Sequence, residues 1–312
     1  MKRVLMIVAV VCTLSFFLIG GTVHAGCVMP PAGLVSWWTG DGHTNDIADS
    51  NTGVLKNGAS YAPGISGLAF SFDGVDDYVE IGAPGNLDIL KSLTLGAWIK
   101  RLGDGTGAYP AFSVIVGKAG LSGSAQWDSW FLYYGEGKPE FFVVSSDNNI
   151  NYLIGPVLPD NVWHYLAGTF DDATRAMKLY VNGVLVAEGT TTAGLPVNLA
   201  PVRIGCSSHE FTPVPIYEPF NGLIDEVEIY DHALTATEIQ SIYLAGSAGK
   251  CKADVSGCIA LKGIPLSNTL ITLQQKKIRD QITSSDVNGC YEFYNVVSRK
   301  DFKVIINGPV VP

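Results

Sequence analysis

The sequence is poor in charged side chains, and those that it has are biased toward acids. Charged residues make up 16% of the 312 residues, and 29 Asp and Glu against 20 Lys and Arg give a formal net charge of −9. Nucleic-acid binding depends on clustered lysines and arginines that contact phosphates. The composition therefore argues against a nucleic-acid partner.

The sequence also lacks an apolar run long enough to cross a bilayer. The run over residues 4–19 spans 16 residues, whereas a transmembrane helix needs about 20. It follows Lys2 and Arg3, and small residues precede a cleavage site after Ala25, as in a secretory signal peptide. We therefore expect residues 1–25 to be removed and the protein to be secreted or held at the cell surface. Lipid anchoring at Cys27 is the alternative.

The cysteines form no CxxC pair, and none has a histidine at zinc-ligand spacing, which argues against a zinc site. Five cysteines follow the signal peptide. Their positions suggest one disulfide between Cys27 and Cys251 and another between Cys258 and Cys290. Cys206 would then be an unpaired, buried small apolar side chain.

Short strands and tight turns dominate the rest of the chain. Its 35 glycines favour turns over long helices. Residues 69–72, 78–81 and 93–99 have the composition of strands. Asn182 and Gly183 predict a two-residue hairpin turn, because both accept the positive φ that such a turn needs. The pattern indicates an all-β chain built as a sandwich.

One helix is predicted over residues 236–244. Thr235 and Glu238 have the spacing of a capping box at its start. A stretch of Ala, Gly and Ser follows and is typical of a linker. Since the length suggests two domains, we expect one at residues 26–249 and a second at 250–312.

Six motifs follow one another along the first domain: GLVSWW at 33–38, AFSFDGVDDYV at 69–79, WHYLAGTF at 163–170, LYVNG at 179–183, RIG at 203–205 and FNGLIDEVEIY at 220–230. Together they resemble a laminin-G-like, concanavalin-A-like jelly-roll domain. The resemblance implies two antiparallel sheets stacked face to face, one of them concave. It also implies binding of extracellular carbohydrate or protein.

The second domain carries a different resemblance. Its motifs include residues 255–258, 263–266, 271–273 and 285–293. They are similar to a carboxypeptidase-regulatory-like or prealbumin-like β-sandwich, a module that serves as a spacer in its family. The stretch is short for such a domain, so a truncated copy is one interpretation.

The jelly-roll resemblance implies a structural calcium ion held by Asp46 and Asp225. Asp225 shares strand parity with Leu223 and Val227, so we expect it among apolar neighbours, where a carboxylate needs donors or a cation. Backbone carbonyls near residues 57–58 could complete the shell, because calcium takes six to eight oxygens. The alternative is that these carboxylates accept hydrogen bonds from turn amides. The acidic run at 73–77 is interpreted as a solvated hairpin corner.

Aromatic side chains in a small-residue loop are the candidate ligand contacts. Trp127 and Trp130 lie in the small-residue loop at 120–130, and Tyr134 follows it. Sugar rings present apolar C–H faces that stack on such rings. The alternative for Trp130 is a place in the core.

Catalysis finds no support in the sequence. It has no Glu-x-Asp-x-x-Glu string of a glycosidase, no local serine or cysteine triad and no phosphate-binding glycine loop before a helix. Glu226 and Glu228 share one strand face, which we expect to be exposed to solvent. We therefore predict a secreted, non-catalytic module that binds extracellular polysaccharide or glycoprotein. A structural or adhesive surface protein that binds other proteins is the alternative.

Overall fold

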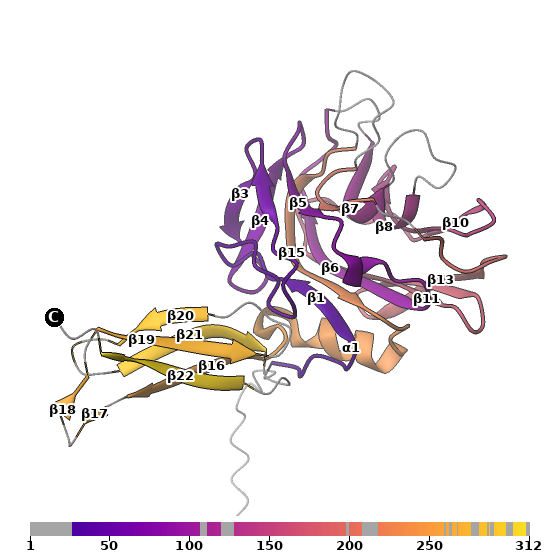
Figure 1. Ribbon diagram of the computed structural model, residues 1–312. Helices are drawn as coiled ribbons and strands as arrows, with labels where there is room; N and C mark the ends of the chain where they lie inside the picture. Colours follow the sequence, from indigo (N-terminus) through magenta and orange to yellow (C-terminus); the bar gives the residue numbers. More distant parts are fainter. Residues whose placement is uncertain are drawn as a thin grey trace, which may run out of the picture.

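The computed structural model describes residues 27–106, 111–119, 128–197, 200–207 and 218–258 and, beyond these, 260–261, 264–266, 268–275, 281–285, 287, 290–297 and 302–309. Two large antiparallel sheets form a β-sandwich, and one helix packs beside them (Figure 1). The predicted all-β jelly-roll fold is confirmed.

The larger sheet contains eight strands. Seven are hydrogen-bonded in the order β13-β12-β11-β6-β15-β4-β3, and β1 pairs with β15. The strands are β1 (Leu34–Trp38), β3 (Ser60–Pro63), β4 (Leu68–Asp73), β6 (Leu93–Arg101), β11 (His164–Asp171), β12 (Ala176–Val181), β13 (Val184–Thr190) and β15 (Asn221–Tyr230).

The second sheet contains seven strands in the order β10-β9-β8-β7-β14-β5-β2. They are β2 (Val54–Lys56), β5 (Tyr78–Gly82), β7 (Phe112–Ala119), β8 (Asp128–Gly135), β9 (Lys138–Val144), β10 (Ile150–Ile154) and β14 (Val202–Ile204). A short 3-10 helix, η1 (Gly85–Leu87), follows β5.

The main core lies between the two sheets. Trp38, Phe70, Trp130 and Phe141 are fully buried there, together with many aliphatic side chains. Burial of each large apolar side chain contributes about 1.5–3 kcal/mol to the folded state. The core therefore holds the two sheets in a fixed relation to each other.

The predicted local signals are present. Helix α1 spans Ala236–Ala245, and Thr235 and Glu238 form the full capping box at its start. Asn182 and Gly183 both have positive φ, 50° and 77°, at the turn between β12 and β13. A second 3-10 helix, η2 (Gly246–Ala248), follows α1. Among the described residues, no helix has both the length and the apolar character needed to cross a membrane.

A disulfide and a buried ion cluster fasten the two ends of this sandwich together. Cys27 and Cys251 form the predicted disulfide, whereas Cys206 is free and buried as expected. The ammonium group of Lys250, next to the disulfide, lies 3.0 Å from Glu226 Oε2 and 3.1 Å from Glu228 Oε2.

The prediction that Glu226 and Glu228 face solvent is wrong. Glu226 is 1% exposed and Glu228 is fully buried. The register of β15 against β6 shifts between residues 225 and 228, and Glu226 has a positive φ of 53°, so the strand departs from simple alternation here. Trp37 donates to Glu226 through its indole N–H, and Tyr165 and Tyr230 donate to Glu228 through their hydroxyls.

The strands that follow form small separate sheets. β16 (Lys252–Cys258) pairs with β21 (Cys290–Val297), β17 (Ala260–Leu261) pairs with β18 (Ile264–Pro265), and β20 (Gln281–Ser284), β19 (Thr269–Gln275) and β22 (Phe302–Pro309) form a third sheet. Figure 1 shows them grouped apart from the two large sheets. The strand register places Cys258 opposite Cys290, and the disulfide between them stays a prediction, as do the family of this part and the domain boundary.

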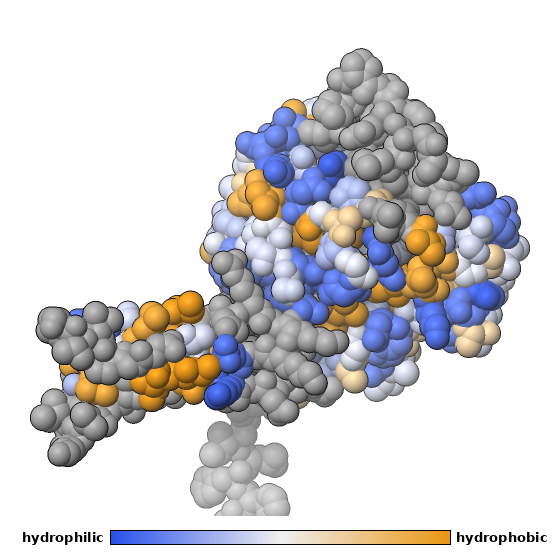
Figure 2. Space-filling model, in the orientation of Figure 1, coloured by the Kyte–Doolittle hydropathy of each residue, from blue (hydrophilic) through white to orange (hydrophobic). Residues whose placement is uncertain are grey.

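Part of this group of strands has an apolar surface. Leu270, Ile282 and Ile306 are all exposed, and Figure 2 shows apolar side chains gathered over these strands. The larger body has a more mixed surface in the same view.

Candidate functional site

A pocket of about 300 Å³ lies on the outer face of the seven-stranded sheet. Strands β7, β8, β9 and β10 supply most of its lining. The lining consists of Phe112, Phe131, Tyr133, Glu140, Phe142, Ile150, Tyr152 and Glu218, and we call it the aromatic groove.

Strand alternation explains why these side chains point away from the core. Successive residues of a strand face opposite sides of the sheet. In β8, Trp130 and Leu132 are buried in the main core, so Phe131 and Tyr133 face outward. The register pairs Phe131 with Phe142 and Tyr133 with Glu140 of β9, which brings the outward residues of both strands together.

The rings of the groove pack against one another. The centroids of Phe131 and Phe142 are 5.8 Å apart in an edge-to-face arrangement, and those of Phe112 and Tyr133 are 6.0 Å apart and stacked. A Cβ at Gly135 would lie 2.7 Å from both the Phe112 ring and the Glu140 carboxylate. Glycine at this position therefore gives both groups room to lie close to the sheet.

One end of the groove is open. Ile150 and Tyr152 of β10 are 62% and 57% exposed. Tyr152 lies opposite Phe142 in the register of β9 and β10, so an exposed ring continues the row of packed rings. A ligand with a flat apolar face could stack on Tyr152 without displacing the core.

Two carboxylates give the groove its charge. Glu218 hydrogen bonds with Tyr133, and burial together with this carboxylate holds the pKa of Tyr133 well above its usual value. Burial also raises the pKa of Glu140, and the charges of Glu136 and Glu218 raise it further, while Lys138 partly offsets them. Glu140 is thus partly desolvated and close enough to Glu218 for the two charges to interact.

The structure does not bring the ligand residues predicted from the sequence to this groove. Trp127 lies outside the described residues. Trp130 is fully buried and Tyr134 is 1% exposed, both in the main core, so neither ring can reach a ligand. Both are on β8 but have the opposite parity to Phe131 and Tyr133. For Trp130 the core alternative is the one that the structure supports.

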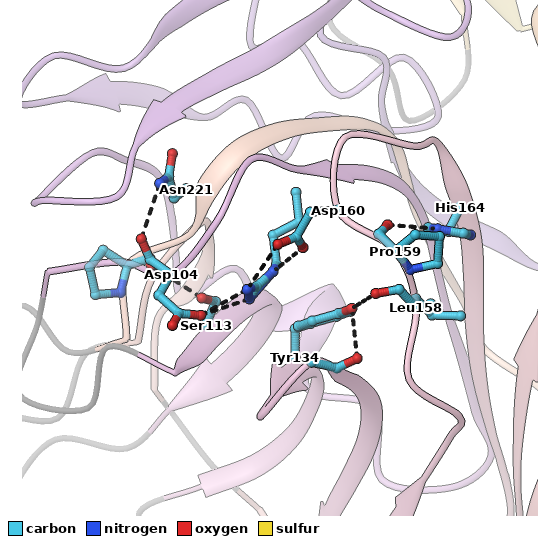
Figure 3. Close-up of polar contacts among 11 residues, drawn as sticks. Asp104, Ser113, Tyr134, Leu158, Pro159, Asp160, His164 and Asn221 are labelled. Atoms are coloured by element: carbon cyan, nitrogen blue, oxygen red, sulfur yellow. Dashed lines mark hydrogen bonds and ion pairs between the residues drawn. The ribbon is translucent and has the colours of Figure 1, made fainter.

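Tyr134 instead fixes the loop that follows β10. Its hydroxyl donates to the carbonyl of Gly137 at 2.9 Å and lies 3.2 Å from the carbonyl of Leu158 (Figure 3). Its ring lies 4.9 Å below the guanidinium of Arg101. That guanidinium forms ion pairs with Asp104 and Asp160, each at 2.8 Å. Tyr134 thus supports the fold beneath the aromatic groove.

The two predicted calcium ligands are both buried. Asp46 Oδ1 accepts hydrogen bonds from the backbone amides of Trp37, Ala48 and Asp49. Burial raises the pKa of Asp46 to about 6, although these amides oppose the shift. The other oxygen, Oδ2, is buried and has no hydrogen-bond partner of good geometry. This oxygen has the chemistry of a cation ligand.

The hydrogen bonds that Asp225 accepts come from a different turn. Its Oδ2 accepts from the amides of Ile65 and Ser66 at 2.9 and 3.1 Å. At the turn of residues 57–58, Gly58 N donates to Asp77 Oδ1 at 2.6 Å. Both Asp46 and Asp225 therefore accept amide hydrogen bonds, as in the alternative interpretation. A calcium ion at Asp46 and Asp225 stays a prediction.

Three acids of the run at 73–77 do lie close together. In the described part of the chain, ligand oxygens of Asp73, Asp76 and Asp77 all lie within 4.8 Å of one another. Asp73 is exposed, as expected for a hairpin corner, but Asp77 is buried and accepts from the Asp73 amide. Burial, and then the charges of Asp73 and Asp76, raise the pKa of Asp77 although two amide bonds oppose the shift.

A jelly-roll sandwich with an aromatic groove on one outer sheet face defines a lectin-like β-sandwich protein. The family comparison agrees with this class. Residues 73–240 match the family model of the concanavalin A-like lectin/glucanases superfamily, and the chain belongs to that superfamily.

Solved structures with the same fold are distant in sequence. Domain 4 of AbnA, an extracellular arabinanase from Geobacillus stearothermophilus solved with arabinotriose, is 20% identical with a TM-score of 0.50, and the match covers 66% of this chain and 96% of that one. The binding domain of Paraclostridial Mosquitocidal Protein 1 is 14% identical with a TM-score of 0.53, covering 81% and 64%.

A third structure is the ligand binding domain of botulinum neurotoxin serotype D in complex with N-acetylneuraminic acid. It is 15% identical with a TM-score of 0.50, and the match covers 78% of this chain and 57% of that one. A search of curated protein sequences gave no match. At these identities, the structural similarities establish the fold alone.

Proposed function

We propose that this protein is a secreted, non-catalytic carbohydrate-binding module and that its ligand lies in the aromatic groove. The observation that carries the proposal is the exposed ring of Tyr152, which continues the packed rings of Phe142 and Phe131 across the outer sheet face. Five of the eight lining residues are aromatic. A sugar chain could stack on the flat, apolar surface of this row of rings.

The chemistry of the groove suits a sugar. The C–H face of a pyranose ring is apolar, and an aromatic side chain covers it at low cost in conformational entropy because it has only two rotatable bonds. The carboxylates of Glu140 and Glu218 can accept hydrogen bonds from ligand hydroxyls or amines. Apolar rings with a few convergent polar groups are the usual composition of a ligand pocket.

Two further observations support the proposal. The arabinanase domain was solved with arabinotriose and the neurotoxin domain with N-acetylneuraminic acid, so other proteins with this fold bind saccharides. The disulfide between Cys27 and Cys251 fits an oxidising, extracellular compartment, as does the signal-peptide pattern over residues 1–25. A structural calcium ion at Asp46 and Asp225 belongs to the same proposal.

A glycan-binding assay with matched variants tests the proposal. The mature chain, residues 26–312, is applied to a panel of polysaccharides, and binding is measured for the wild type, Tyr152→Ala and Leu244→Ala. Leu244 is 62% exposed on α1, outside the groove lining. We expect Tyr152→Ala to weaken binding at least tenfold, because aromatic anchors contribute about 2 kcal/mol or more, and Leu244→Ala to bind as the wild type does.

Other outcomes would contradict the proposal. If no polysaccharide binds, the groove is not a carbohydrate site, and binding to extracellular proteins instead would favour the adhesive role. If saccharides bind but Tyr152→Ala binds as tightly as the wild type, the site lies elsewhere on the molecule.

A further inference from the structure

We propose that β10, at the edge of the seven-stranded sheet, is an interaction surface for a second copy of this chain, and that two copies pair antiparallel along it. This inference goes beyond the proposed carbohydrate-binding function and does not depend on it. Among the described strands β10 pairs only with β9, and it lies at the margin of the larger body (Figure 1).

β10 lacks the features that keep edge strands from pairing with another chain. Strand edges are usually protected by a charged residue, a proline, a bulge or a short length. The other three strands at the ends of the two large sheets have such a feature: β2 ends with Lys56, β3 ends with Pro63, and β13 carries Glu188. β10 has no charged residue or proline, and its register with β9 runs without a bulge. It is therefore the edge at which a further strand can add.

The free backbone groups of β10 belong to alternate residues. Gly155 N donates to the carbonyl of Pro139 at 2.8 Å, and the register of the two strands places these residues opposite each other. In an antiparallel pair, residues that exchange hydrogen bonds alternate with residues whose backbone groups point away. The amides and carbonyls of Ile150, Tyr152 and Ile154 therefore point away from β9, toward the open edge.

The same three residues carry exposed apolar side chains. Ile150, Tyr152 and Ile154 are 62%, 57% and 44% exposed, and their spacing places them on one face of the sheet. The order Ile-x-Tyr-x-Ile is the same in both directions. Antiparallel pairing about Tyr152 therefore places each Ile150 opposite an Ile154 and the two Tyr152 residues opposite each other. Each pair can exchange two backbone hydrogen bonds, and the apolar cross-strand contacts add to the stability of the joined sheet.

The charge around β10 favours a second copy over a charged partner. The chain has a formal net charge of −9, which opposes self-association in general. Residues 148–159 contain no charged side chain, so two copies can meet there without bringing like charges together. A two-fold axis at Tyr152 also keeps both aromatic grooves on the same side of the joined sheet, where Tyr152 of the second copy extends the row of rings.

The mass of the mature protein in solution tests the proposal. Size-exclusion chromatography with light scattering is run at several protein concentrations on the wild type and on Ile154→Lys, a residue outside the groove lining. We expect twice the mass of one chain for the wild type and the mass of one chain for the variant, because a lysine at an open edge blocks strand addition. Val184→Lys, at a residue 61% exposed on the edge strand β13, is the matched control and should stay dimeric.

A charge-swap variant tests the register. Ile150→Glu and Ile154→Lys should each give single chains. The double variant should recover the dimer, because each glutamate then lies opposite a lysine of the other copy. Within one chain the two positions are four residues apart on an extended strand, which is too far for them to pair with each other.

The failures of this inference differ from those of the proposed function. A wild type that has the mass of one chain at every concentration would refute the inference. A dimer that Ile154→Lys leaves intact would refute it as well, and dissociation by Val184→Lys would then place the interface on β13. Single chains for the double variant would refute the antiparallel register about Tyr152. The mass is measured without saccharide, so none of these results bears on the carbohydrate-binding function.

Discussion

Removing the ammonium group of Lys250 should destabilise the protein strongly. In Lys250→Met the carboxylates of Glu226 and Glu228 stay buried, yet the ammonium nitrogen that both approach within 3.1 Å is gone. Burial lowers the pKa of Lys250, but the charges of Glu228 and Glu226 outweigh it and raise the pKa above its usual value. Lys250 is thus fully charged at neutral pH.

The expected loss can be estimated from the burial of all three groups. Removing one partner of a buried ion pair costs about 3–5 kcal/mol, because it leaves an uncompensated charge in a region of low dielectric. The side chains of Lys250, Glu226 and Glu228 are 1%, 2% and 0% exposed. Their hydrogen bonds from Trp37, Tyr165 and Tyr230 remain in the variant and keep the loss toward the lower end of that range.

The pH dependence follows from the sign of the pKa shift. A lysine whose pKa is raised on folding stabilises the protein fully below its unfolded pKa, and this contribution is lost only as the pH rises through its folded pKa. The difference between wild type and Lys250→Met should therefore be constant around neutral pH.

Urea unfolding of the mature protein, followed by tryptophan fluorescence, measures this effect. Lys91→Met, at an exposed position, is the control and should change the free energy of unfolding by less than about 0.5 kcal/mol. Adding Glu226→Gln and Glu228→Gln to Lys250→Met should restore most of the stability, because no buried charge is then stranded. A loss below about 1 kcal/mol for Lys250→Met, or no recovery in the triple variant, would refute the reasoning.

Four further predictions concern other parts of the molecule. Tyr134→Phe should lower the free energy of unfolding by about 1–2 kcal/mol, because the carbonyl of Gly137 loses its donor and that of Leu158 loses a nearby hydroxyl; an unchanged urea midpoint would contradict this. Replacing Cys27 and Cys251 together by serine should cost about 2–5 kcal/mol, and a variant as stable as the oxidised wild type would contradict it. Because the folded pKa of Glu140 lies above its usual value, its carboxylate is protonated at a higher pH than usual, and saccharide binding that uses this carboxylate as a hydrogen-bond acceptor should weaken there on acidification; an identical pH profile in Glu140→Gln would count against this role. Calcium should raise the melting temperature of the wild type and not that of Asp46→Asn, and an equal shift in both would remove Asp46 from the calcium site.

Much of the fold could be predicted because its signals are local. The Asn182-Gly183 turn depends on the φ preferences of two residues, and the start of α1 depends on Thr235 and Glu238 within one turn. The disulfide between Cys27 and Cys251 joins the two ends of the sandwich, where sequence position alone suggested it.

The groove could not be found in the same way. The stretch from Trp130 to Tyr134 is apolar or aromatic at every position, so alternation did not show which parity faces the core. The charged positions Lys138 and Glu140 of β9 mark the outward face. The conclusion that Phe131 and Tyr133 also face outward depends on the pairing register of β8 and β9, which the sequence does not show.

The burial of Glu226 and Glu228 could not be predicted from the sequence for a different reason. Simple alternation assigns the charged residues of a strand to its solvent face, but β15 shifts register against β6 between residues 225 and 228. The partner that compensates both carboxylates, Lys250, lies more than 20 residues away in the sequence. No local pattern contains that contact.

A crystal structure of the protein with a bound oligosaccharide from the binding panel tests the central claim most directly. Our account predicts a sugar ring stacked on Tyr152, with an amino or hydroxyl group within hydrogen-bonding distance of Glu140 or Glu218. A sugar bound on the eight-stranded sheet, or anywhere outside the aromatic groove, would contradict it.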